Sequence, residues 1–287
     1  DLNYPYNTGS DGPGNCCGFF QPSFSMANAY RTVNGLPILT ETAGAPDYNL
    51  AANAVKNDFG VNSSAAFTED TNPLDPRIDH TIGRRGIQYL DWIEHPGANW
   101  IRKQDYAGPY SPKKYIYYKR QENTLTDGSS WTRGYATMNF NIIRFADVLL
   151  MAAEAEIEAG SLTTALGYIN QVRNRAANPA GFVMKGGVAE ANYVIAPYTA
   201  FADKAAATKA VRMERLLELA TEGHRFFDLV RWGTDVTTLN AYLAYESKYL
   251  VTKFGGASYQ ATDKYLPIPQ AQIDIQGSSI LKQNAGY

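Results

Sequence analysis

Residues 211–233, VRMERLLELATEGHRFFDLVRWG, contain the most informative pattern of the sequence. Their first half predicts a helix, because apolar side chains recur at helical spacing and charged side chains surround them. The apolar positions are Met213, Leu216, Leu217 and Ala220, and the charged positions are Arg212, Glu214, Arg215, Glu218 and Glu222. Gly223 and His224 interrupt the pattern, and residues 225–232 predict a second short helix with two phenylalanines and a terminal tryptophan.

This stretch resembles the ERRxELAxEGHRxFDLxRWG signature of the SusD/RagB family, the surface glycan-binding lipoproteins of Bacteroidetes. Further segments resemble motifs of the same family. Residues 142–160 are similar to its RYAEVLLMYAEA helix, and residues 168–176 are similar to its YINxVRxRA helix. KYLPIPQAQIDI at 264–275 and LKQNAGY at 281–287 resemble its closing motifs, with Ala285 where proline is usual. LDPRIDHTI at 74–82 is similar to its DPRL stretch.

The resemblance implies a mainly α, SusD/RagB-like helical fold, with tetratricopeptide-type helical hairpins, long irregular loops and a few short strands. It also implies a structural role for the residues that match the family motifs. These are Arg144, Asp147, Glu154, Asn170, Arg173, Arg175, Glu214, Arg215, Glu218, Glu222, Gly223, His224, Arg225, Phe227, Asp228, Trp232, Pro267 and Pro269.

The chain divides into two unlike regions, and we interpret 1–287 as one domain, the C-terminal SusD/RagB-like region of a protein whose N-terminal half is absent. Residues 1–140 are loop-rich, with short candidate strands such as Tyr115–Lys119, and form the candidate ligand surface. Residues 141–176 predict a helical hairpin with a cap at Gly160 and Ser161, and a third helix lies near 204–222. Residues 234–287 are expected to wrap back on the core.

The composition fits a soluble, folded chain. A hydrophobic fraction of 45%, a charged fraction of 19% and a net charge of −2 match neither a disordered tail nor a nucleic-acid binder. The start carries no initiator Met, signal peptide or lipobox, so we interpret the chain as a trimmed form of a lipid-anchored protein.

The charged residues of the helical motifs invite an enzymatic interpretation, as in a glycoside hydrolase. Glu218, Glu222 and Asp228 could supply a carboxylate pair with cationic partners. Their helical spacing favours ion pairs and caps instead, and His224 is expected to pack within its motif. We therefore predict no catalytic residue and no cofactor.

A metal site is not predicted either. His80 and His95 stand fifteen positions apart in loop-like sequence and have no third ligand at a zinc spacing. The acidic run between Glu69 and Asp75 lacks the central glycine and closing glutamate of a calcium loop.

Cys16 and Cys17 are adjacent, and the extracytoplasmic setting of the family would permit a disulfide. Across a trans peptide their Cα atoms would lie about 3.8 Å apart, below the usual disulfide range, so two thiols are the default expectation. An oxidised pair beside Phe19 and Phe20 would form a rigid apolar ledge on which a sugar ring could rest.

Aromatic residues carry the functional argument. A sugar binder needs an exposed ring beside polar groups that satisfy the sugar hydroxyls, and residues 88–106 provide this mixture. The candidate ligand-binding residues are Trp92, Trp100, Tyr89, Tyr106, Trp131, Asp91, Asn99 and Arg102. The alternative is that these rings fill the core beneath long loops.

The resemblance implies non-catalytic binding of oligosaccharides at the cell surface, for delivery to a SusC-like TonB-dependent transporter in the outer membrane. The expected partners are an oligosaccharide, that transporter and the membrane through a lipid anchor, without nucleic acid. A peptide-capturing protein or a transporter lid is the alternative. An exposed aromatic platform would favour a glycan, and a groove lined by backbone donors and acceptors would favour a peptide.

Overall fold

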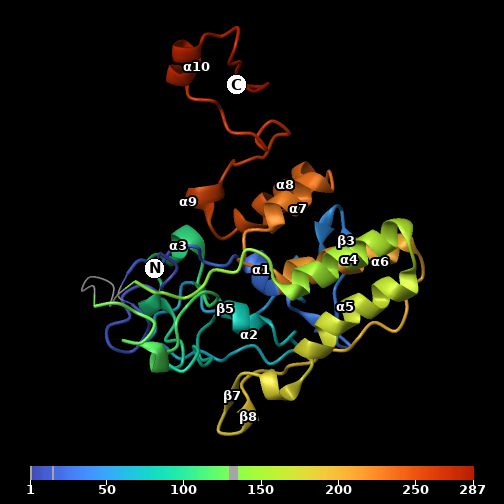
Figure 1. The fold of residues 1–287 in the computed structure, drawn as a ribbon. Coiled ribbons are helices and arrows are strands. Elements are labelled where there is room, and N and C mark those ends of the chain that lie inside the picture. Colours follow the sequence, from blue (N-terminus) through green and yellow to red (C-terminus); the bar gives the residue numbers. More distant parts are fainter. Residues whose placement is uncertain (1, 15, 129–134) are drawn as a thin grey trace.

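The computed structural model describes residues 2–14, 16–128 and 135–287, and helices dominate its regular structure (Figure 1). The α-helices are α1 Phe24–Ala29, α2 Ile78–Thr81, α3 Gln104–Ala107, α4 Phe145–Ala159, α5 Leu162–Ala176, α6 Lys204–Glu218, α7 Arg225–Arg231, α8 Asp235–Glu246, α9 Val251–Phe254 and α10 Gln270–Gln276. Short 3-10 helices are η1 Asp47–Asn49, η2 Ala98–Trp100, η3 Lys119–Gln121 and η4 Pro179–Gly181.

The strands form small antiparallel pairs rather than an extended sheet. They are β1 Thr32–Val33 with β2 Leu36–Pro37, β3 Glu41–Thr42 with β4 Ala45–Pro46, β5 Ile82–Gly83 with β6 Ser111–Pro112, and β7 Met184–Lys185 with β8 Val188–Ala189. The predicted fold class, mainly helical with a few short strands, is confirmed. The predicted strand at Tyr115–Lys119 is wrong, because Tyr115 lies in a turn with a left-handed φ of 59° and η3 starts at Lys119.

The predicted hairpin and third helix are present and pack side by side (Figure 1). Gly160 ends α4, and the Ser161 hydroxyl caps α5 by accepting a hydrogen bond from the Thr164 amide. A core of small and branched apolar residues joins the three helices, namely Leu150, Ala153, Ile157, Ala165, Ile169, Val172, Ala207, Ala210 and Val211. Its alanines allow close helix contact. That the hairpin belongs to a longer tetratricopeptide-type stack stays a prediction.

The end of α6 sets up the next helix. Asp203 caps its start, and the helix ends at Glu218, earlier than the predicted 222. Thr221 and Gly223 both take positive φ angles, 64° and 88°, so the chain turns sharply here and enters α7. This turn leaves Glu222 outside the helix but still beside Glu218.

The loop-rich region contributes to two further groups of buried residues, the first of which also includes Leu217 of α6 and Tyr245 of α8. One apolar cluster gathers around α1 and α2, where Phe24, Tyr30, Ile78 and Tyr110 are buried. A second, aromatic cluster contains Tyr4, Tyr89, Trp92, Trp100, Ile116 and Tyr117. Ring edges meet ring faces in this cluster, as expected for packed aromatic side chains.

The C-terminal segment corrects one expectation. α8 packs on α1, but the segment that carries α10 leads away from the helical body (Figure 1). It is held by its own contacts, such as those of Gln283 with Ile268 and of Asn284 with Leu266. Leu266 is 82% exposed, and Ile280 is 78% exposed. The prediction that residues 234–287 wrap back on the core is therefore wrong for this last part, whose polar groups are satisfied locally.

Within the ranges that the structure describes, no helix combines the length and the apolar character needed to cross a bilayer.

Candidate functional site

A ladder of carboxylates runs along one side of α6. Glu214, Glu218 and Glu222 are four residues apart, so successive side chains emerge on the same side of the helix and its turn. Glu214 is fully buried and lies between two guanidiniums, with Arg77 Nη2 at 2.9 Å and Arg173 Nη1 in direct contact. Arg173 also donates to the carbonyls of Ala196 and Gly35, which ties α5 to distant loops.

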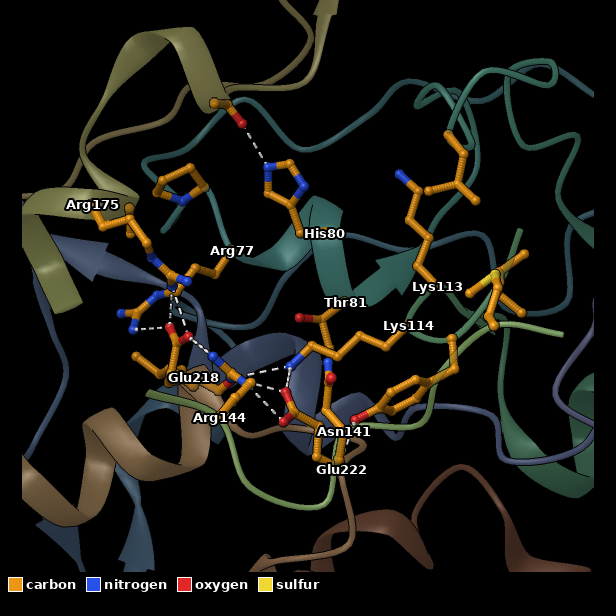
Figure 2. Close-up of a pocket in the computed structure, with 18 of the residues that line it drawn as sticks. Arg77, His80, Thr81, Lys113, Lys114, Asn141, Arg144, Arg175, Glu218 and Glu222 are labelled. Atoms are coloured by element: carbon orange, nitrogen blue, oxygen red, sulfur yellow. Dashed lines mark hydrogen bonds and ion pairs between the residues drawn. The ribbon is translucent and has the colours of Figure 1, made fainter. Parts of the chain in front are cut away.

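Glu218 and Glu222 form the end of the ladder that lines a cavity, although both side chains are almost completely buried (Figure 2). Arg144 Nη1 lies 2.6 Å from Glu218, and Arg175 Nη2 lies 2.7 Å from the same carboxylate. Arg144 Nε and Lys114 Nζ reach Glu222 at 2.7 Å and 2.5 Å. Burial alone would raise the pKa of Glu218, but the surrounding guanidiniums, Arg77 first, outweigh it and lower the pKa to about 2.

A second network joins α4, α6 and α7. Arg215 bridges Asp147 at 2.8 Å and Asp228 at 2.9 Å. Arg231 makes a two-pronged contact with Glu154, whose carboxylate also accepts the indole N–H of Trp232. Asn170 pairs with the backbone of Tyr198 through both ends of its amide. The polar groups of these motif residues thus bind one another across separate elements and hold those elements together.

Other motif residues have different surroundings. Gly223 and His224 lie in the turn before α7, where His224 is half-buried. Phe227 is 71% exposed on α7. Pro267 and Pro269 belong to the C-terminal segment that leads away from the body.

A cavity of about 560 Å³ opens above the ladder, and we call it the charged cavity (Figure 2). Arg144, Glu218 and Glu222 form part of its wall, with His80 and Asn141 among the other polar lining residues. The pairing of β5 with β6 brings the 74–82 motif beside Lys113 and Lys114. Both lysines are engaged. Lys113 donates to the carbonyls of Asp79 and Gln88, and Lys114 donates to the carbonyl of Glu218 and the carboxylate of Glu222.

A neighbouring cavity of about 760 Å³, the aromatic cavity, shares part of that wall. The residues that line both cavities are Lys114, Tyr115, Met138, Asn139 and Glu222. Phe20 and Phe140 line only the aromatic cavity and are 69% and 65% exposed. The ring of Phe140 stacks on Tyr115 with a centroid distance of 4.4 Å. Asn3 and Gln21 add amide groups to the wall.

The structure places three of the predicted ligand-binding residues in the interior. Tyr89, Trp92 and Trp100 are buried in the aromatic cluster, and the indole N–H of Trp92 donates to the carbonyl of Tyr117. They cannot present a ring face to a ligand in this conformation. Their placement agrees with the alternative that these rings fill the core beneath the loops.

The other predicted ligand-binding residues lie closer to the surface. Asp91 accepts hydrogen bonds from η3, and Tyr106 is exposed with Lys253 Nζ 4.0 Å from its ring centroid. Asn99 and Arg102 are also exposed. Trp131 lies outside the described residues.

Cys16 and Cys17 form a disulfide in the structure, so the default expectation of two thiols is wrong. That expectation assumed a trans peptide, whereas the bond between them is cis. Beside the disulfide, Arg102 donates to the Cys17 carbonyl, and its guanidinium lies 5.2 Å from the ring centroids of both Tyr6 and Phe19.

Metal ligands do not converge anywhere in the described part of the chain, where no three His, Cys, Asp or Glu side chains form a possible ion site. His95 is buried against Ser111, and His80 contacts the carbonyl of Gly181.

Sequence reasoning missed the residues of the aromatic cavity. Phe140 and Asn139 stand just before the first helical motif, in a stretch without periodicity, and Phe20 entered only through its place beside the cysteines. A usable signal was the single ring of Phe140 between the two amides of Asn139 and Asn141 in TMNFN at 137–141.

Comparisons of this chain with family models, curated proteins and solved structures all point to the same family. The model of the SusD family matches residues 1–287. Two SusD-like proteins of Formosa agariphila are similar to this chain. One is 34% identical over 206 residues, covering 68% of this chain and 36% of that protein. The other is 40% identical over 93 residues, covering 32% of this chain and 15% of that protein.

Solved structures of SusD-like proteins are also similar to this chain. A SusD superfamily protein from Bacteroides vulgatus aligns at 28% identity and a TM-score of 0.52, covering 75% of this chain and 40% of that chain. A SusD-like protein from Bacteroides fragilis shares the fold at 20% identity and a TM-score of 0.55, covering 93% and 47%. The chain thus spans less than half the length of each of these relatives.

Proposed function

Because the chain belongs to the SusD family, we propose that it takes part in non-catalytic glycan binding for nutrient uptake at a bacterial cell surface. The ligand is an oligosaccharide that lies in the aromatic cavity and extends along the shared wall into the charged cavity. The stacked pair of Phe140 and Tyr115, facing a cavity that Phe20 also lines, is the observation that carries the proposal.

The chemistry of the aromatic cavity suits a sugar. Exposed rings offer flat apolar faces for the C–H face of a pyranose, and the amides beside them suit its hydroxyls. The volume of about 760 Å³ lies in the range of small-molecule sites.

Backbone conformation gives separate support. Phe20 and Tyr115 both have φ angles of 59°, a left-handed conformation that is rare for bulky residues. Such outliers concentrate at binding sites, where the surrounding structure holds a side chain in a required place. Here they lie on the wall of the same cavity.

The carboxylates of the shared wall favour binding over hydrolysis. A glycosidase needs one carboxyl group that can donate a proton near neutral pH. Glu218 and Glu222 are each held by at least two cations, which lower the pKa of both carboxyl groups despite their burial.

We further propose the family's cellular context for the protein to which this chain belongs. It would be lipid-anchored at the outer membrane and would deliver the bound oligosaccharide to a TonB-dependent transporter. The exposed Asn99, Arg102 and Tyr106 stay candidates for a peripheral contact with a longer glycan.

The first experiment is a glycan array and a peptide array probed with this chain and with its Phe20→Ala and Phe140→Ala variants. Phe227→Ala, which removes an equally exposed ring from α7, is the matched control. We expect a saturable glycan signal that both cavity variants weaken and the control retains. Glycan binding that survives both cavity variants would reject the site, and binding to peptides alone would favour the peptide-capturing alternative.

A further inference from the structure

A separate cavity of about 230 Å³ lies among α6, α7 and the β3–β4 hairpin. Its wall is rich in cations, since Lys209 and Arg212 come from α6 and Arg225 begins α7. Trp232 and Tyr48 add aromatic rings to the same wall. None of these residues lines the charged or the aromatic cavity, so the inference is independent of the glycan proposal.

Two arginines of this cavity lack the partners that other motif arginines have. Arg144, Arg173 and Arg215 each bind carboxylates. In the described part of the chain, neither Arg212 nor Arg225 makes a side-chain hydrogen bond or an ion pair, and the Arg212 Nε is buried without an acceptor. A buried donor without an acceptor is unfavourable, so an acceptor brought from outside would be bound favourably.

Both guanidiniums are held in place by an aromatic ring. They lie 4.7 Å and 5.7 Å from the ring centroid of Trp232, whose indole N–H is fixed by Glu154. A cation over a ring is stabilised through its face, which leaves the N–H groups at its edge available. The cavity therefore holds prearranged donors.

The charges that face the cavity are unbalanced. Lys209, Arg212 and Arg225 are positive, and Glu41 on β3 is the acidic lining residue. Glu41 makes no ion pair with them in the described structure, and Asp228 nearby is occupied by Arg215 and Arg231. Burial lowers the pKa of Arg225, an effect that neighbouring Tyr48 and Asp228 only partly offset.

We propose that this cavity binds a carboxylate group, which receives hydrogen bonds from the edges of Arg212 and Arg225. A planar carboxylate matches the fork of a guanidinium. A second small cavity shares Tyr48, Leu216 and Arg225 with the first and adds Leu239 and Met26. The ligand is therefore a carboxylate with a short apolar body, either a free organic acid or an acidic side chain of a polypeptide.

The test is a titration of this chain with butyrate, followed by tryptophan fluorescence. We expect a saturable change that Trp232→Phe abolishes. Butyramide, which has the same shape without the charge, and chloride at equal ionic strength should have no effect. Arg225→Gln should weaken binding by about tenfold or more, because it removes a charged donor.

Two controls keep the result interpretable. Arg120→Gln removes an exposed arginine that lies over the Tyr118 ring, and it should leave the titration unchanged. Glu41→Gln removes the acidic group that faces the same cavity, so it should strengthen butyrate binding. Loss of the signal in Arg120→Gln, an equal response to butyramide or chloride, or full binding by Arg225→Gln would overturn the proposal.

A second ligand distinguishes a free organic acid from an acidic side chain of a polypeptide as the source of the carboxylate. This ligand is N-acetylglutamate amide, which mimics an acidic side chain in a polypeptide. Stronger binding of this compound than of butyrate would indicate a polypeptide ligand, and the reverse would indicate a free acid. If neither compound gives a saturable change, the cavity does not bind carboxylates and the proposal fails.

Discussion

The charged cavity and the aromatic cavity share a wall, but their side chains have opposite surroundings. Carboxylates on one side are paired with cations, whereas rings on the other side face solvent. On the ladder side, Glu214 and Glu218 are surrounded by guanidiniums of three separate segments. On the other side, Phe20 and Phe140 expose most of their surface to solvent. The ion pairs of the first side hold the fold together, and the rings of the second side are accessible from solvent, so substitutions on the two sides should have different effects.

The largest expected effect is on the ladder. Glu214→Gln removes the carboxylate that pairs with the buried Arg173 and one of the three carboxylates that pair with Arg77. We expect the free energy of unfolding to fall by about 3–5 kcal/mol, because breaking a buried ion pair leaves an uncompensated charge. Chemical denaturation measures this change.

Glu158→Gln is the control for that variant. Glu158 pairs with Lys204 on the surface, where both side chains are more than half exposed. Such pairs contribute about 0–1 kcal/mol. Equal losses in the two variants would remove the distinction between a structural ladder and ordinary surface pairs.

Removing a buried ring should also act on stability. Trp100 packs edge-on against Tyr89 and His95, and its ring closely contacts Gly12. Trp100→Ala should cost about 3–5 kcal/mol through the cavity it leaves. Phe20→Ala should change stability by only about 0.5 kcal/mol, since its ring is largely exposed. Thermal melts of both variants measure these changes in stability. A small loss of stability in Trp100→Ala would contradict the interior role of this ring.

The ladder should also set the acid limit of the protein. The folded-state pKa of Glu218, about 2, lies below its unfolded value near 4.5. A depressed carboxyl pKa stabilises the fold above the unfolded pKa, and this contribution is lost as pH falls through the folded pKa. We expect a loss on the order of 3 kcal/mol between about pH 5 and pH 2. Stability that stays constant over this range would contradict the pairing.

Glu246 provides the opposite case, a buried carboxyl group that has no ion pair with a cation in the described part of the chain. Burial raises its pKa to about 7, and one oxygen has no hydrogen-bond partner in the described structure. The contribution of Glu246 to stability is therefore fully present below about pH 4.5 and is lost as pH rises through 7. Glu246→Gln keeps an acceptor for the Ser25 amide, so it should stabilise the fold by about 1–3 kcal/mol at pH 8. Chemical denaturation at pH 4 and pH 8 measures the difference in stability between Glu246→Gln and the unaltered chain. A variant that is less stable than the unaltered chain at pH 8 would contradict the prediction.

The helical half could be predicted from the sequence because its signals are local. The spacing of Leu150, Ala153 and Ile157 defines an apolar face, and Gly160 with Ser161 marks the turn. Likewise, carboxylates four residues apart on α6 indicated ion pairs, although the sequence did not reveal that their partners come from Arg77 and Lys114 in the loop-rich region.

The aromatic cavity could not be predicted in the same way, because exposure in a loop depends on contacts distant in sequence. Trp92 and Phe140 both stand in irregular segments with amides nearby. Trp92 is buried against Tyr117, whereas Phe140 stacks on Tyr115 and stays exposed. Composition identified a region rich in rings, and only the fold separated the structural rings from those that can meet a ligand.

The most direct test of glycan binding in the aromatic cavity is a calorimetric titration of the double variant Phe20→Ala/Phe140→Ala with an oligosaccharide that binds the unaltered chain. We predict an affinity about tenfold lower or weaker still, because two stacking surfaces are lost, with a melting temperature close to that of the unaltered chain. An unchanged affinity in a normally folded double variant would contradict the account.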